Sequence, residues 1–218
     1  MKLLEKVLGV IIVIALIMKF AFIVGSNVLI VMAISLLSVI YYPMGFAFFN
    51  GIRLRDILKK ASYKGLSTWR ILGAIGAGMA LSNLLVGILF SIMHYPGAGF
   101  MLYSSIFIAA IILGIVSVKY LKTKSEFYKR ILIRIAIIGG IALLLALIPS
   151  MAITKLQYRN YPAYIEARQY WIDHPNDEEA YKRQIIEYNR VILPPQEFEL
   201  YMQENYPDID TNKTYGTE

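Results

Sequence analysis

The stretch that decides the fold is ILGAIGAGMALSNLLVGILFSIMHYPGAGFMLYSSIFIAAIILGIVSV, residues 71–118, which contains no lysine, arginine, aspartate or glutamate. Its two apolar runs, 71–93 and 100–118, are separated by a few proline- and glycine-rich residues. A helix needs about 20 apolar residues to cross a hydrocarbon core of about 30 Å, so each run is long enough. Proline and glycine favour a tight turn between the runs. We therefore expect two antiparallel transmembrane helices, and the predicted turn residues are Pro96, Gly97 and Gly99.

Three further apolar stretches, at residues 7–24, 28–49 and 131–153, have the same character. The first is too long for the apolar part of a signal peptide, and no small-x-small cleavage site follows it, so we interpret it as a retained helix. The sequence predicts an all-α polytopic membrane bundle of five transmembrane helices, with a small helical extramembrane tail at the C-terminus.

Composition agrees with a membrane protein. Of the 218 residues, 57% are hydrophobic and 17% are charged, whereas soluble domains carry about 25% charged residues. The mean hydropathy is +0.55. The absence of cysteine excludes a secreted fold that depends on disulfides.

The charges of the loops predict the orientation. Residues 51–70 and 119–130 are rich in lysine and arginine, whereas the two short turns between paired spans carry no charge. Cytoplasmic loops are enriched in lysine and arginine, so both basic loops and the N-terminus are expected inside and the tail outside. The pI of about 9.4 then reflects topology and contact with anionic lipid headgroups, and we expect no nucleic-acid partner.

These features divide the chain as follows: a first transmembrane hairpin 1–50, a basic loop 51–70, a second hairpin 71–118, a basic loop 119–130, a fifth helix 131–154 and an acidic, tyrosine-rich tail 155–218.

Two details leave alternatives open. The residues Ile17-Met18-Lys19 end the first helix much as Ile92-Met93-His94 end the third. The likeness indicates either a duplicated two-helix unit or the general similarity of apolar hairpins. Residues 52–60 form either a short amphipathic helix at the membrane interface or a simple basic loop.

The tail is expected to hold three short helices, at 161–172, from Asn176 to about 192, and at 196–205, with a frayed end at 207–218. Asn176 is predicted to cap the second helix, with Glu179 at its third position. Nine of the 16 tyrosines lie in this tail, and rigid aromatic side chains suit a contact surface. The tail is expected to dock on the membrane helices, on a second copy or on a partner protein. The predicted partner-contact residues are Tyr164, Trp171, Tyr181 and Tyr188.

The chain shows no pattern typical of an enzyme. It has two histidines and no cysteine, and none of the common nucleotide-, metal- or nucleophile-containing motifs is present. We therefore predict no catalytic, cofactor-binding or metal-binding residues. Ala74, Gly78 and Ser82, spaced by four, predict a helix-packing face, used either within the chain or in a homo-oligomer.

Ionisable residues inside a membrane are functional candidates because their burial is costly. Lys19 either reaches the headgroups or faces the bundle interior near His94. His94 is either part of a structural hairpin or a group that responds to protons. No aspartate or glutamate lies in the five predicted spans, which weakens an ion-coupled function.

The segment Gly87–Gly99, GILFSIMHYPGAG, resembles the membrane hairpin of the gliding-motility and type IX secretion protein family GldL of the Bacteroidetes. The family usually has a lysine where Ser91 stands. The matching positions are Ile92, Met93, His94, Pro96, Gly97 and Ala98. The resemblance implies a bacterial inner-membrane protein, and in that family a proton-driven motor subunit with a periplasmic partner. This chain differs in having five predicted spans, no glutamate in the second helix of the matching hairpin and no long cytoplasmic domain.

Together these features predict a non-enzymatic integral inner-membrane subunit that anchors or scaffolds a larger cell-envelope assembly. Its N-terminus is expected in the cytoplasm and its C-terminus in the periplasm. The expected partners are the lipid bilayer and one or more proteins, or a second copy. The alternatives are an ion-conducting or motor-type subunit, in which Lys19 and His94 face a hydrated path, and a small transporter or lipid-active enzyme.

Overall fold

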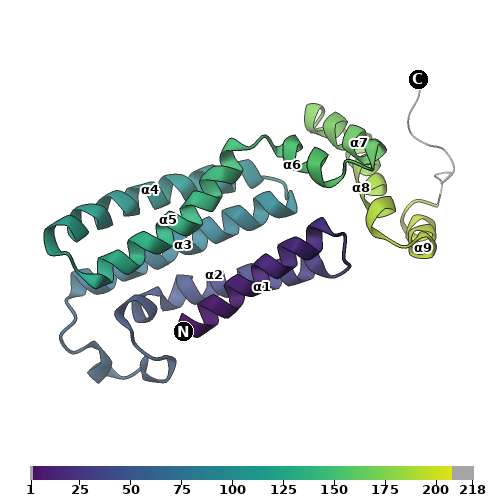
Figure 1. The fold of residues 1–218 in the computed structure, drawn as a ribbon. Helices are drawn as coiled ribbons and strands as arrows, with labels where there is room; N and C mark the ends of the chain where they lie inside the picture. Colours follow the sequence, from purple (N-terminus) through teal and green to yellow (C-terminus); the bar gives the residue numbers. More distant parts are fainter. Residues whose placement is uncertain (1, 208–218) are drawn as a thin grey trace. The chain divides into compact units, whose positions relative to one another are not determined.

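The computed structural model describes residues 2–207, which form nine α-helices and two short 3-10 helices (Figure 1). Most of the expected frayed end, residues 208–218, lies outside the described residues. The chain divides into two compact units, Met1–Leu147 and Ile148–Glu218. Each unit is described by itself.

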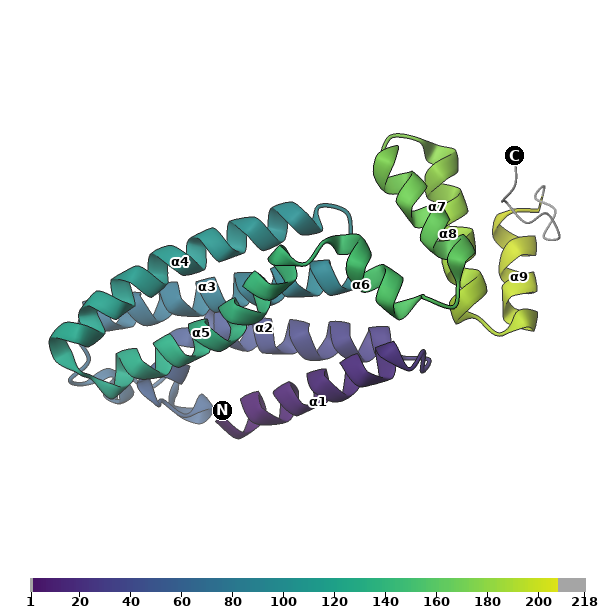
Figure 2. The ribbon, with the colours of Figure 1, turned by 45° about the horizontal axis from the view of Figure 1, so that its top comes forward.

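The first unit is an all-helical bundle in which successive helices run antiparallel (Figures 1 and 2). The helices α2 and α3 form its middle, α1 packs on α2, and α4 and α5 pack on α3. The helices are α1 (Lys2–Phe20), α2 (Ser26–Asn50), α3 (Thr68–Met93), α4 (Ala98–Thr123) and α5 (Glu126–Leu147).

Four of these helices, α2 to α5, are long and apolar enough to span a membrane. We call this unit the membrane unit because it holds all four. The fifth expected span, α1, carries Lys2, Glu5, Lys6 and Lys19 within its length and is not one of the four. The helices α4 and α5 leave large apolar side chains exposed, among them Phe107 and Ile137, as lipid-facing helices do.

The last expected span differs from the observed helix. We expected residues 131–153, but α5 begins at Glu126 and ends at Leu147, and α6 (Ser150–Gln157) starts after Pro149. Apolar residues continue past this point, but proline has no backbone N–H and cannot continue the hydrogen-bond ladder. By contrast, α2 continues through Pro43 to Asn50.

The loop between α2 and α3 forms no α-helix. It contains two 3-10 helices, η1 (Leu54–Asp56) and η2 (Lys60–Tyr63). The amphipathic α-helix considered for residues 52–60 is therefore absent. The end of the membrane unit that carries this loop and the α4–α5 turn is called the basic end below.

The two hairpins α1–α2 and α3–α4 turn in the same way. Phe22 and His94 both have φ 55°, and three residues later Gly25 and Gly97 have φ 85° and 76°. In each turn the next residue donates its amide N–H to the carbonyl five residues earlier. These bonds run from Ile23 to Met18 at 2.9 Å and from Tyr95 to Phe90 at 3.0 Å. The two turns therefore correspond at an offset of 72 residues. The sequence likeness that aligned Lys19 with His94 needs an offset of 75, so the backbone does not support that alignment.

The second unit is a small helical assembly with its own core. It contains α6, α7 (Pro162–Asp173), α8 (Glu178–Ile192) and α9 (Pro195–Asn205), and α7 and α8 pack as a pair. The predicted cap of α8 was wrong by one residue. The Asp177 side chain, not Asn176, accepts from the amides of Glu179 and Ala180 at 2.9 and 3.2 Å.

Candidate functional site: a charged layer at the basic end

Three helices meet at a partly buried ion pair in the membrane unit. Arg134 of α5 donates from Nε and Nη2 to the two carboxylate oxygens of Glu5 on α1, both at 2.7 Å. The two side chains are 16% and 20% exposed. The hydroxyl of Tyr41 on α2 donates to the same carboxylate. Bidentate, charge-assisted bonds of this kind are strong and directional, so Glu5 is held by α2 and α5 together.

Arg134 makes one further hydrogen bond and contacts two aromatic rings. Its Nη1 donates to the carbonyl of Arg130 at 3.0 Å. Its guanidinium carbon lies 4.8 Å from the ring centre of Phe48 and 5.8 Å from that of Phe49, within the range of a cation–π interaction. All three guanidinium nitrogens therefore have an acceptor.

A second arginine ties the same end together. Arg70, in the first turn of α3, donates from Nε to Asn50 Oδ1 at 2.9 Å. Its guanidinium carbon lies 4.6 Å from the ring centre of Phe127 on α5. Asn50 ends α2, so this bond joins the two helix ends that flank the long loop. We call the following residues the charged layer: Glu5, Tyr41, Phe48, Asn50, Arg70, Phe127 and Arg134.

The geometry of the charged layer suits a fixed helix arrangement. Both oxygens of Glu5 accept from Arg134, so the carboxylate is already neutralised and oriented. Removing one partner of a buried pair leaves an uncompensated charge and typically costs about 3–5 kcal/mol. The layer therefore specifies which helices lie together and in what register.

The sequence reasoning missed this pair. Glu5 lies outside the predicted first span, 7–24, and Arg134 lies near the start of the predicted last span, 131–153. One signal was present, because Glu5 is the only acidic residue among the first 55. A lone acid at the start of an apolar helix is a reason to look for a cation elsewhere in the bundle.

The structure places the two candidate ionisable residues, Lys19 and His94, at the opposite end. Lys19 is buried, with 8% exposure, and its Nζ donates to Asn27 Oδ1 at 2.7 Å. Asn27 is the second residue of α2, so this bond crosses the first turn. His94 is the C-cap of α3 and is half-buried.

The predicted small-residue face, Ala74, Gly78 and Ser82, lies where α3 crosses α2. A Cβ added to Gly78 would lie 2.4 Å from the Tyr41 carbonyl oxygen and 3.0 Å from Gly45 Cα. The hydroxyls of Ser82 and Ser38 are hydrogen-bonded at 2.6 Å. Ala74 is fully buried at the same contact. These residues serve an internal helix contact.

The predicted turn residues divide between the turn and α4. Gly97 is the N-cap of α4 with φ 76°, a conformation that favours glycine, and Pro96 precedes it. Gly99 is the second residue of α4 and not part of the turn, because α4 begins at Ala98.

The four tail aromatics have different environments. Tyr164 is 2% exposed, and its ring lies 4.5 Å from that of Tyr158 and 5.7 Å from that of Tyr188. Burial raises the pKa of both Tyr158 and Tyr164. Tyr164 therefore belongs to the interior rather than to a contact surface. Trp171 and Tyr181, with ring centres 5.9 Å apart, remain at least partly exposed.

Two further features bear on chemistry. Among residues 2–207, no three histidine, cysteine, aspartate or glutamate side chains are grouped to hold a metal. An apolar groove of about 310 Å³ lies between α4 and α5 over Leu84 of α3, with Ala109 and Gly140 in its walls.

Comparison of the chain with protein-family models, curated proteins and solved structures finds no match. The functional argument therefore depends on the residues of this chain alone.

Proposed function

We propose that this chain is a non-enzymatic integral membrane subunit that anchors or scaffolds a larger cell-envelope assembly. One observation carries the proposal. A second compact unit with its own tyrosine core directly follows the last candidate span. A membrane bundle joined to a folded extramembrane unit is suited to fixing a contact surface beside the bilayer. The polar groups of the bundle core, Glu5 with Arg134 and Ser38 with Ser82, bind one another.

We also propose that α1 is a fifth span. It packs along α2, and its 19 residues correspond to about 28 Å at 1.5 Å per residue. Its Leu3, Val10 and Ile17 are exposed and repeat with helical spacing on one face. Of its charged residues, Glu5 and Lys19 are engaged by neighbouring helices.

With five spans the two termini lie on opposite sides of the membrane. The lysine- and arginine-rich loops support an N-terminus in the cytoplasm and a tail in the periplasm of a bacterial inner membrane. The chain has no cysteine, so single cysteines can report topology. Val24→Cys and Leu200→Cys, at exposed positions, should react with an impermeant maleimide from the periplasm. Thr123→Cys, at the exposed end of α4, should react only after the membrane is opened. Reaction of Leu3→Cys and Val24→Cys from the same side would contradict the fifth span.

The scaffold role is tested by crosslinking and purification from native membranes with a C-terminal tag. We expect a reproducible stoichiometric partner. Trp171→Ser and Tyr181→Ser should each reduce its recovery about tenfold, the effect of losing one aromatic anchor. The matched control is Leu200→Ser, on an exposed residue of α9, which should retain the partner. A monodisperse chain recovered alone in mild detergent would contradict the proposal.

A second candidate is an ion-conducting or motor-type subunit related to the gliding machinery. The observation in its favour is the Glu5 carboxylate, which lies inside the membrane unit. Such a function requires Glu5, Lys19 or His94 to change partners during each cycle. If Glu5→Gln, Lys19→Leu and His94→Gln all leave the phenotype of the parent organism intact, this candidate is eliminated.

A further inference from the structure

We propose that the loop of residues 51–67 is a binding surface for anionic phospholipids, and that it lies on the leaflet with Leu58 and Trp69 inserted. The inference depends on the membrane-spanning arrangement proposed above, but not on the scaffold role. It concerns one specific loop and differs from the general tendency of basic loops to stay on one side of a membrane.

The loop is held against the end of α2. Its two ends are joined by the hydrogen bond between Arg70 and Asn50. The ring of Tyr63 stacks on that of Phe46 at 6.0 Å, and its hydroxyl donates to the carbonyl of Ile57. Phe46 lies four residues before the end of α2, about 6 Å back along the helix. The loop therefore folds back against α2 instead of extending into the aqueous phase.

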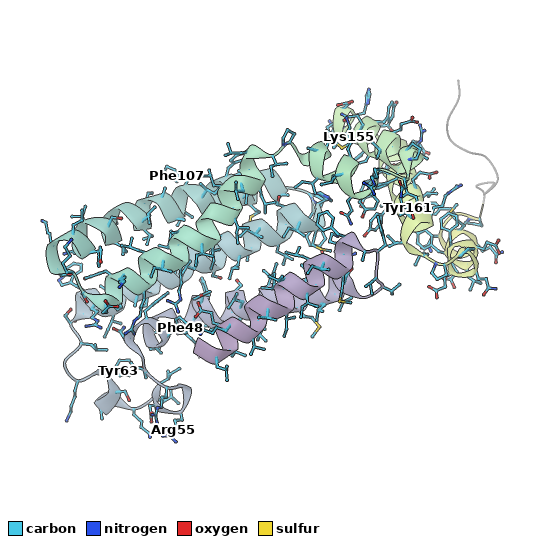
Figure 3. The ribbon with its side chains drawn as sticks, viewed as in Figure 1. Phe48, Arg55, Tyr63, Phe107, Lys155 and Tyr161 are labelled. Carbon is cyan, nitrogen blue, oxygen red and sulfur yellow. The ribbon has the colours of Figure 1, made fainter. Side chains whose placement is uncertain are left out.

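The charge of the loop fits an anionic surface. Its five cations, with one carboxylate, give residues 51–67 a net charge of +4, and all five are exposed. The carboxylate, Asp56, lies 2.8 Å from Lys59 Nζ and 3.8 Å from Arg55 Nε. The hydrogen bond from Lys59 lowers the pKa of Asp56. Figure 3 shows Arg55 and Tyr63 within this loop. The exposed cations are Arg53, Arg55, Lys59, Lys60 and Lys64.

Two large apolar side chains project from the same region. Leu58 is 97% exposed and Trp69 is 83% exposed. Tryptophan favours the interface between headgroups and hydrocarbon, and a leucine flanked by lysines is typical of segments that lie in that interface. Cations contact the phosphates while the apolar groups enter the acyl boundary. This combination favours lipid over a protein partner.

The α4–α5 region provides a matched control within the chain. It is also basic, with Lys119, Lys122 and Lys129 near the same end, but it has only a short turn and no tryptophan. If charge alone governed lipid binding, both regions would contribute equally.

The test uses the full chain with Trp171→Phe, which leaves Trp69 as the only tryptophan. The protein is reconstituted in vesicles of phosphatidylcholine with or without phosphatidylglycerol, some with brominated acyl chains. We expect Trp69 emission to shift to the blue with phosphatidylglycerol and to be quenched by the brominated lipids. Native mass spectrometry of the chain in mixed micelles measures which lipids it retains.

The loop variant Arg53→Gln/Lys60→Gln/Lys64→Gln should lower the preference for phosphatidylglycerol by at least about tenfold, since one cation near a membrane surface contributes roughly fivefold. Lys119→Gln/Lys122→Gln/Lys129→Gln should lower it by much less. Equal effects of the two triple variants would overturn the inference. So would Trp69 emission that changes with neither phosphatidylglycerol nor brominated lipid. Burial of Trp69 without bromine quenching would assign the loop to a protein contact. A chain that a carbonate wash removes from vesicles would refute the spanning arrangement itself.

Discussion

The ion pair between Glu5 and Arg134 leads to the sharpest prediction. In Glu5→Met, the guanidinium of Arg134 keeps its burial and loses both bonds to the carboxylate, each 2.7 Å long. Breaking a buried pair on one side costs about 3–5 kcal/mol. Since the two side chains keep 16% and 20% exposure, we expect about 3 kcal/mol, and the same for Arg134→Met. The double variant replaces the pair by apolar groups and should cost only about 0–1 kcal/mol.

The assay is thermal unfolding of the purified chain in mild detergent. For a chain of this length, 1 kcal/mol corresponds to roughly 2–4 °C in Tm, so each single variant should lose about 6–12 °C and the double variant little. Tyr41→Phe is the matched control, because it removes one hydroxyl donor and no charge, and should cost about 1 kcal/mol. A double variant whose loss equals the sum of the single losses would show that the two residues do not interact, and would refute the reasoning.

Three further predictions concern stability and are measured by thermal unfolding or by its dependence on pH. Gly78→Ala should lower the free energy of unfolding by about 1–3 kcal/mol because its new Cβ would clash with α2. Gly73→Ala, with nothing within 4 Å of its new Cβ, should stabilise α3 slightly, and equal Tm values for the two variants would contradict the close crossing. Asp177→Ala should cost about 1 kcal/mol of stability through loss of the cap, and Asn176→Ala almost nothing. Thermal unfolding followed by helical circular dichroism measures both, and the reverse order would restore Asn176 as the cap. Burial raises the pKa of Tyr201 to about 12, so its contribution to stability is complete below pH 10 and is lost as the pH rises from 10 to 12; a Tyr201→Phe variant with the same alkaline loss would contradict this.

The apolar runs were sufficient to predict the helical class and the positions of α2, α3 and α4. Hydropathy was less informative at the end of α5. The residues around Pro149 remain apolar, so the run continues in composition although the helix stops. The loop 52–60 shows the same limit. Its amphipathic pattern is compatible with an α-helix. In the structure the loop folds back so that Tyr63 stacks on Phe46, and it forms two 3-10 helices instead.

The charged layer was beyond the reach of local patterns. Glu5 and Arg134 are separated by 129 residues, and each on its own is explained by proximity to a helix end. Their pairing depends on the lateral order of the helices, in which α1 and α5 both approach Tyr41 of α2. The small residues were easier, because a spacing of four on one helix is enough to predict a packing face, although not its partner.

The equivalence of the two hairpins changes the meaning of the motif around His94. In the first hairpin Phe22 holds the same position with the same φ of 55°, so the turn itself does not need a histidine. A function for His94 must therefore come from its imidazole and not from its place in the backbone. The same offset of 72 residues places Lys19 where the second hairpin has Ser91. Lys19 and His94 therefore occupy different positions in their two hairpins, and each needs its own variant to test its role.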